Sequence, residues 1–303
     1  MTTRFVASLI TALLAVAPTE AVADTTAAFD LDGRQIIQDE EHLGIVNGKL
    51  TSGINYRDVT GIGGLWAPPF VSSNFMLDGR VNGEKVPTTK WLWRPYQVER
   101  EGTVGNVAVS TTTTLIYGQR AAVVSFTFKN AGSTSVPLEL FTLGWLDSVR
   151  DWGFARASSA SPTTLQADGR ELIMRQGNLA VIVAIDSREW TWEASGNLGH
   201  AFAPLPARQT RTVNVVMTIG SADEAAAAAG KILTNPAGAV TAARNEYARQ
   251  VGEVFKRLPA LESNNAQLVQ WYNRSLVHFL MNRWEVPEFV LHPYYSTGSI
   301  KGG

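Results

Sequence analysis

The neighbouring stretches "VAVSTTTTLIYG" (107–118) and "AAVVSFTFKN" (121–130) decide the fold class of this chain. Both are rich in β-branched and aromatic residues, which pack well on the pleated surface of a sheet. Turn residues separate the two stretches, as they do between consecutive strands. The pattern therefore predicts two successive β-strands.

The same strand pattern continues on both sides, from about residue 28 to residue 219. "VPLELFTLGWL" (136–146) alternates apolar with mixed positions, whereas "LAVIVAI" (179–185) is continuously apolar, as in a strand buried on both faces. The dipeptides Asp78-Gly79 and Asp168-Gly169 signal turns. We therefore expect a mainly β protein, built as a large antiparallel sandwich of roughly ten or more strands.

The pattern changes from strand to helix at Ser221. Ser221 and Glu224 have the spacing of a capping box, in which each side chain accepts a hydrogen bond from the backbone of the other residue. Asn235 and Pro236 end this helix and begin a second one, with Asn as N-cap and Pro in the first position. Pro259 ends the second helix.

A third helix is expected from near Ser263 to about Trp284. Its apolar and aromatic residues repeat at helical spacing: Leu268, Trp271, Tyr272, Leu276, Phe279 and Leu280. Two arrangements remain open for this wide stripe. Either the helix packs on the sandwich or the linking helices, or it is the first helix of an α-helical barrel.

The N-terminus has the pattern of a secretory signal peptide. Arg4 precedes an apolar run from Phe5 to Ala17, and Ala21-Val22-Ala23 forms an A-x-A cleavage pattern. The alternative is a short membrane anchor, but the run has about 13 residues and a span needs roughly 20. The chain has no cysteine, so an exported protein of this kind depends on its core alone. We expect a periplasmic or secreted protein.

Charge and motifs exclude several function classes. The formal net charge of −1 argues against a nucleic-acid partner. The chain has no G-x-S-x-G, H-E-x-x-H or P-loop motif, and its four histidines are too scattered for metal-ligand spacing. No metal, cofactor or membrane span is therefore expected. For His278, packing on the third helix is favoured over a ligand role.

The segment "NRWEVPEFVLHPYYSTGSIKGG" (282–303) concentrates aromatic and charged residues in a loop-like stretch. Loops of this kind usually carry a site, and Trp and Tyr offer apolar faces with a polar edge, which suits a pyranose ring. The candidate substrate-binding residues are Trp284, Tyr294, Tyr295 and Lys301. The alternative is an aromatic contact between domains.

Two further groups leave alternatives open. Glu285 and Glu288 could form the carboxylate pair of a glycosidase, or they could be two solvated acids in a loop, which we favour. Trp91 and Trp93 lie on one face of a strand, next to Arg94 and Tyr96. With Trp66 they form either a binding ledge or, as we prefer, a seam against the helical part.

The order of parts resembles the N-terminal portion of glycoside hydrolases whose catalytic domain is an (α/α)6 toroid. An export signal, a β-supersandwich and linking helices precede a helix that runs into "NRW" and a later "KGG". The nearest groups are the family 63 α-glucosidases and the amylo-α-1,6-glucosidase-like, six-hairpin enzymes. Families 15 and 65 and the cellobiose-phosphorylase group share this order.

The resemblance implies a signal peptide at 1–23, a β-supersandwich at 24–220, a helical linker at 221–260 and the start of a truncated (α/α)6 domain at 261–303. It implies hydrolysis of a glycosidic bond with inversion, by two carboxylic acids later in the toroid. No catalytic residue is therefore expected in this chain. The alternatives are a non-catalytic carbohydrate-binding module and the N-terminal part of a polysaccharide lyase or glycoside phosphorylase.

Overall fold

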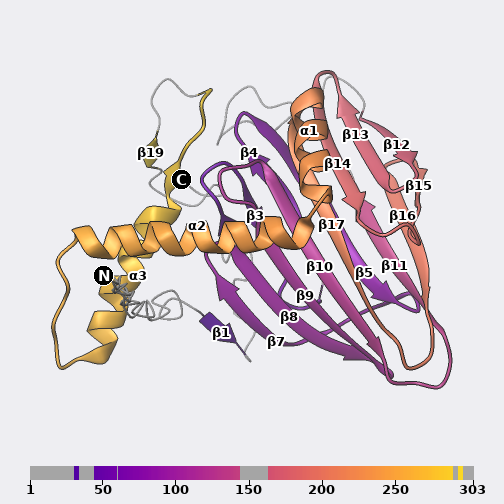
Figure 1. Ribbon diagram of the computed structural model, residues 1–303, viewed down its shortest axis with the longest axis horizontal. Coiled ribbons are helices and arrows are strands. Elements are labelled where there is room, and N and C mark those ends of the chain that lie inside the picture. The colour runs from indigo at the N-terminus through magenta and orange to yellow at the C-terminus, as the bar shows by residue number, and fades with distance from the viewer. Residues whose placement is uncertain (1–30, 34–43, 60, 144–162, 289–292, 296–303) are drawn as a thin grey trace, which may run out of the picture.

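The computed structural model describes residues 31–33, 44–59, 61–143, 163–288 and 293–295 (Figure 1). In this part of the chain two large antiparallel sheets and three helices form a mainly β fold, as the sequence predicts. The expected signal peptide at 1–23 lies outside the described residues. No helix among the described residues is both long and apolar enough to cross a membrane.

The first sheet has nine described strands. Their order across the sheet is β1 (Leu31–Gly33), β7 (Thr88–Arg94), β8 (Gln97–Val104), β9 (Val107–Leu115), β10 (Ala121–Asn130), β17 (Thr210–Ser221), β14 (Leu179–Ile185), β13 (Glu171–Gln176) and β12 (Thr164–Asp168). The two stretches that decide the fold class are β9 and β10, which pair antiparallel with Phe126 opposite Thr111. This prediction is confirmed.

The second sheet has eight described strands. Their order is β15 (Trp192–Ser195), β16 (Leu198–Leu205), β11 (Val136–Leu143), β5 (Phe70–Val81), β4 (Gly63–Ala67), β3 (Thr51–Gly53) and β2 (Ile45–Val46), with β6 (Glu84–Lys85) paired to β5. The turn expected at Asp78-Gly79 is wrong, because β5 runs through both residues. A Cβ at Gly79 would lie 2.6 Å from the ring of Phe126, so packing against the facing sheet explains this glycine.

The core lies between the two sheets. Phe126 and Phe128 of β10 are fully buried and stack with their ring centroids 5.8 Å apart. Trp91 and Trp93 also belong to this core, and the Trp93 indole N–H donates to the Gly44 carbonyl oxygen at 3.1 Å. The seam expected at these two tryptophans is therefore wrong. They fill the sandwich interior. Tyr96, in the turn between β7 and β8, is the residue of this region that packs with the helices.

Three helices follow the last long strand. They are α1 (Ala222–Leu233), α2 (Pro236–Arg257) and α3 (Ala266–Met281). The capping box of Ser221 and Glu224 is present, and Asn235 is the N-cap of α2 with Pro236 in its first turn, as predicted. The third helix ends earlier than expected, since Arg283–Trp284 forms a short strand, β18, that pairs with β19 (Tyr294–Tyr295).

Helices α1 and α2 cover part of the outer face of the nine-stranded sheet: α1 lies along β14 and β17, and α2 runs across the strands (Figure 1). Ala225 and Ala229 of α1 are buried against Ala180, Ile182 and Ala184 of β14. The continuous apolar run of β14 is thus buried on both faces, as its sequence predicts. A second cluster joins α1 and α2 to β10, β17 and the β9–β10 turn: Ile116, Ala121, Val123, Val216, Ile232 and Ala243.

Candidate functional site

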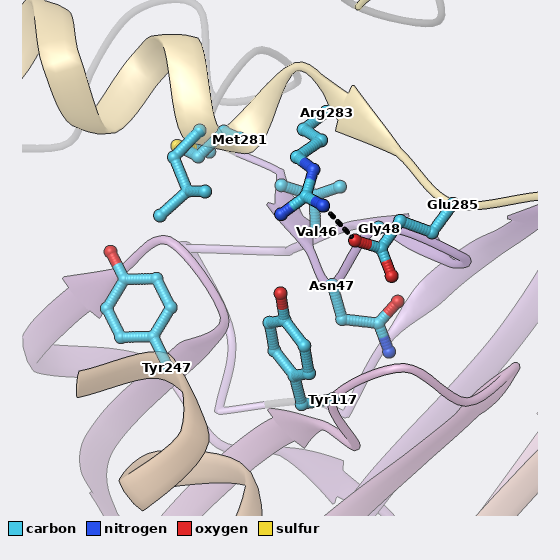
Figure 2. Close-up of a pocket in the computed structure, with 9 residues that line it drawn as sticks. Val46, Asn47, Gly48, Tyr117, Tyr247, Met281, Arg283 and Glu285 are labelled. Atoms are coloured by element: carbon cyan, nitrogen blue, oxygen red, sulfur yellow. Dashed lines mark ion pairs between the residues drawn. The ribbon is translucent and has the colours of Figure 1, made fainter. Parts of the chain in front are cut away.

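A small pocket, lined by both polar and apolar residues, lies where the sandwich meets α2 and α3 (Figure 2). Its walls come from the β2–β3 turn, the β9–β10 turn, the middle of α2 and the segment that follows α3. The lining residues are Val46, Asn47, Gly48, Tyr117, Tyr247, Leu280, Met281, Arg283 and Glu285. Four parts of the chain that are distant in sequence therefore converge at one point.

The β2–β3 turn is held rigidly by Asn47. Its amide nitrogen donates to the carbonyl oxygens of Ile116 at 2.6 Å and Gln119 at 2.8 Å, in the β9–β10 turn. Its amide oxygen accepts from the backbone N–H groups of Lys49 and Leu50. Gly48 follows with φ of +83°, a conformation that favours glycine. Asn47 thus ties two turns together on the floor of the pocket.

Arg283 and Glu285 form the charged side of the pocket. Their ion pair measures 2.7 Å, and Figure 2 shows the Tyr117 hydroxyl pointing toward the side of the pocket where the Arg283 guanidinium lies. Burial raises the pKa of Tyr117 to about 12, and the Glu285 carboxylate adds to this effect, while Arg283 opposes it. The Tyr117 phenol is therefore neutral at physiological pH and serves as a hydrogen-bonding group.

The helical side of the pocket rests on a pair of tyrosines. Tyr247 of α2 packs on Tyr96 with ring centroids 4.4 Å apart, and both contact Val251 and Val277. The backbone N–H of Glu285 also donates to the Gly48 carbonyl oxygen at 2.8 Å. This combination of apolar packing and hydrogen bonds fixes α2 and the start of the post-α3 segment to the sandwich.

The pocket is too small for a sugar. Its volume, including space open to solvent, is about 370 Å³, and its enclosed part has room for about one water molecule. No group of three or more His, Asp or Glu side chains that could hold a metal ion occurs among the described residues. The pocket is thus a polar joint between sandwich and helices.

His278 lies on α3 and does not line the pocket. Desolvation by burial and the nearby Arg274 charge lower the pKa of His278.

The predicted substrate-binding residues differ in what they expose. The Trp284 side chain is only 2% exposed, so it offers no surface to a ligand and has a packing role in this structure. Tyr295 is 45% exposed and stacks on Phe279 of α3, with centroids 4.4 Å apart and an interplanar angle of 16°. Tyr294 pairs with Trp284 in the short sheet, and Lys301 lies outside the described residues.

Both loop carboxylates are engaged in ion pairs. Glu285 binds Arg283, and Glu288 binds Arg120 at 2.5 Å. Arg120 also donates to the Pro68 carbonyl oxygen at 2.7 Å, and its guanidinium lies 5.0 Å from the centroid of the Phe70 ring. Glu288 therefore attaches the post-α3 segment to the β9–β10 turn, whose Arg120 in turn binds the β4–β5 turn. These contacts agree with the loop interpretation of the two acids rather than with a catalytic pair.

One feature that the sequence does not reveal is the open face of α3. Leu268, Trp271 and Phe279 follow at helical spacing and are 44%, 59% and 59% exposed. Only Val277 of this helix is fully buried among its described neighbours. We call Leu268, Trp271, Phe279 and Tyr295 the open α3 face. Sequence periodicity identified the stripe, but it could not tell which part of it the sandwich leaves uncovered.

Comparison with known proteins supports the fold. No protein-family model matches the sequence, and no curated protein sequence matches it significantly. Among solved structures, the chain is similar to a putative kojibiose phosphorylase from human microbiome, with a TM-score of 0.60 and 11% identity over 85% of this chain. It is also similar to a bacterial glucoamylase complexed with acarbose, with a TM-score of 0.53 and 10% identity over 84% of this chain.

This chain spans 42% of the length of each of these two structures. At such low identity the similarity concerns the fold alone, and it does not support family 63 specifically. The chain therefore shares with these two structures a fold in which a β-sandwich is followed by helices.

Proposed function

We propose that this chain is the N-terminal part of an exported glycoside hydrolase that acts on oligosaccharides or polysaccharides with inversion. The observation that carries the proposal is the fold match over most of this chain to a phosphorylase and a glucoamylase, of which it spans 42%. In this proposal 24–220 is the sandwich domain, 221–260 the linker and 261–303 the beginning of the helical catalytic domain.

The open α3 face supports this division of the chain. A helix of a globular domain normally buries its apolar stripe, and contiguous apolar surface of this kind marks a contact with another structure. Trp271 and Phe279 are each 59% exposed, although they belong to the apolar stripe. We propose that further helices of the catalytic domain pack on this face.

The acids that perform the chemistry are proposed to lie outside this chain. An inverting glycosidase needs one carboxylic acid that protonates the leaving oxygen and one carboxylate that activates a water on the opposite face of the sugar. Glu285 and Glu288 form ion pairs with Arg283 and Arg120, so both carboxylates are directed at protein partners. Tyr294, Tyr295 and Lys301 are proposed to border the sugar cleft, whereas the buried Trp284 has a packing role.

The test is to express the complete reading frame that contains this chain, and the chain by itself, and to assay both on a panel of α- and β-linked oligosaccharides. We expect the longer product to release sugar of inverted anomeric configuration, observed by proton NMR, without added phosphate. We expect the chain alone to be inactive. Turnover by the chain alone that disappears in Glu285→Gln or Glu288→Gln would contradict the placing of the acids.

Three other outcomes would each favour an alternative. Strict dependence on inorganic phosphate, with release of a sugar phosphate, would make the protein a glycoside phosphorylase. Products with a new carbon–carbon double bond, seen by ultraviolet absorbance, would make it a polysaccharide lyase. A stop codon directly after Gly303, together with retained sugar binding, would make it a binding module.

A further inference from the structure

The outer face of the eight-stranded sheet is a surface that the proposed function leaves without a role. Among the described residues, the principal contacts of the helices with the sandwich fall on β9, β14 and β17, all strands of the other sheet. The strands β5, β11 and β16 lie side by side in the eight-stranded sheet. Their outward side chains therefore lie on a surface that these helices do not cover.

Strand register brings two rows of chemically unusual side chains together on this face. Phe141 of β11 lies opposite both Asp78 of β5 and His200 of β16. Directly opposed residues of antiparallel strands project from the same face of a sheet. In the next row, Glu139 lies opposite both Arg80 and Phe202. We call Arg80, Glu139, Phe141, His200 and Phe202 the open-sheet patch.

The rings of the patch adjoin one another. The centroids of Phe141 and His200 are 4.9 Å apart, and those of His200 and Phe202 are 5.7 Å apart at an interplanar angle of 90°. Phe202 is 46% exposed. A single exposed apolar residue needs no explanation, but adjacent rings form a continuous surface of the kind that marks a binding site.

The charged part of the patch is held in place from below. The Arg80 guanidinium lies 5.1 Å from the centroid of Phe141, and its Nε pairs with an Asp78 carboxylate oxygen at 3.3 Å. The Asp78 side chain is fully buried, and its other oxygen makes no hydrogen bond within the described part of the chain. Arg80 is thus fixed over the ring, with guanidinium donors to spare at a partly exposed side chain.

The chemistry of the patch fits an uncharged sugar chain. Ring faces meet the apolar C–H face of a pyranose, while Arg80 and His200 donate to hydroxyl groups and Glu139 accepts from them. The charges around the rings nearly balance, since Arg80 and Lys85 face Asp78, Glu139 and Glu193 on the same face of the sheet. A nucleic acid requires an excess of basic groups, which this face lacks.

From these observations we infer that the open-sheet patch binds an uncharged oligosaccharide or polysaccharide chain, at a site separate from the proposed catalytic cleft. The inference rests on the proposed function only for the class of ligand. Its physical role is to hold a polymeric substrate on the enzyme, which raises the local concentration of substrate at the cleft.

The experiment is affinity electrophoresis of the purified chain in gels that contain soluble uncharged polysaccharides, namely an α-glucan, a β-glucan and a mannan. We expect retardation by at least one polymer, with about a tenfold weaker association for Phe202→Ala and for Phe202→Leu, because each removes the ring. Phe202→Trp should retain binding. Trp271→Ala removes another exposed aromatic residue, 59% exposed on α3 against 46% for Phe202, so it is the control and should bind like the parent.

Four results would overturn the inference. They are no retardation by any of the three polymers, equal binding by Phe202→Ala and the parent, an equal loss in Trp271→Ala, and a loss of binding at high salt, which indicates a charged ligand. Far-ultraviolet circular dichroism checks that each variant is folded. In the complete enzyme, Phe202→Ala should weaken cleavage of the polymer but not of a short oligosaccharide, so failure of the patch and failure of the catalytic proposal give different results.

Discussion

The two sheets of the sandwich differ in how their outer faces are covered. The outer face of the nine-stranded sheet is apolar where it lies under α1, so that β14 is buried on both sides, whereas Lys90 of β7 and Glu101 of β8 are exposed further along the same face. The outer face of the eight-stranded sheet carries Arg80, Glu139 and the exposed Phe202, and β11 alternates between buried and partly exposed residues. Part of the first sheet is thus a structural layer between two others, whereas, within the described part of the chain, α1 and α2 do not pack on the outer face of the second sheet.

The largest expected effect tests the interior that both sheets share. Phe126→Ala removes a fully buried ring between the sheets and should lower the free energy of unfolding by about 4 kcal/mol, through lost burial and the cavity that remains. The matched control is Phe202→Ala on the open face, which should change it by less than about 0.5 kcal/mol. Denaturant unfolding of both variants gives the values. Equal losses would contradict the assignment of the two faces.

The next effect tests the contact between α1 and the nine-stranded sheet. Ala225 is buried against β14, so Ala225→Leu overpacks a close helix–sheet contact and should cost about 2 kcal/mol of unfolding free energy. Ala226 is exposed on the same helix, and Ala226→Leu should be neutral within about 0.5 kcal/mol. If both substitutions were neutral, α1 would not be a firm cover of this sheet.

A smaller effect is expected at the start of α1. Ser221→Ala removes the hydroxyl that accepts from the Glu224 backbone and should cost about 1 kcal/mol of stability in thermal or chemical unfolding. Ser275 lies inside α3, where its hydroxyl only donates back to the Tyr272 carbonyl oxygen. Ser275→Ala should therefore be neutral or slightly stabilising. A loss at Ser275 as large as at Ser221 would show that the cap has no special role.

The smallest expected effect is the pH dependence of the stability that Asp78 contributes in the eight-stranded sheet. Burial raises the pKa of Asp78 above its ordinary value, although Lys85 and Arg80 oppose the shift. The folded state therefore binds the proton more tightly than the unfolded state, and this carboxylate destabilises the fold at neutral pH. Asp78→Asn should be at least as stable as the parent at pH 7.

The stability advantage of Asp78→Asn over the parent should shrink as the pH falls from the raised pKa of Asp78 toward 3.8. In this range Asp78 of the folded parent becomes protonated, and it is then uncharged like the Asn side chain. Unfolding midpoints measured across this range check the sign. Glu84→Gln removes an exposed carboxylate from the same sheet and serves as the control. An advantage that grows toward acid would contradict the buried position of Asp78.

Much of the fold was accessible from local patterns. The strands β9 and β10, the capping box at Ser221 and the Asn235-Pro236 helix start depend on neighbouring residues only, and all are confirmed. The turn at Asp78-Gly79 was wrong because Gly79 is required by the Phe126 ring of the facing sheet, which no local pattern contains. Likewise, the spacing of Trp91 and Trp93 placed both side chains on one face of a strand and favoured their burial. It did not show that they are buried between the two sheets.

The sites were less accessible, because they depend on distant parts of the chain. The polar joint brings Asn47 and Tyr117 to Arg283, and the open-sheet patch brings Arg80 to Phe141 and His200. Apart from Arg283, these are isolated residues in ordinary strand or turn segments of the sequence. The aromatic segment after α3 attracted attention by composition, yet the buried Trp284 and the exposed Tyr295 within it have different roles.

The sequence by itself determined where strands and helices begin, which strands are buried on both faces, and that a wide apolar stripe occurs on α3. It could do so because side-chain periodicity and capping act over a few residues. The tertiary structure alone decided which face of each sheet is covered, where Arg283 meets Glu285 and Tyr117, and that three rings adjoin on β11 and β16. Those arrangements depend on strand register and on the packing of layers, which join residues far apart in the chain.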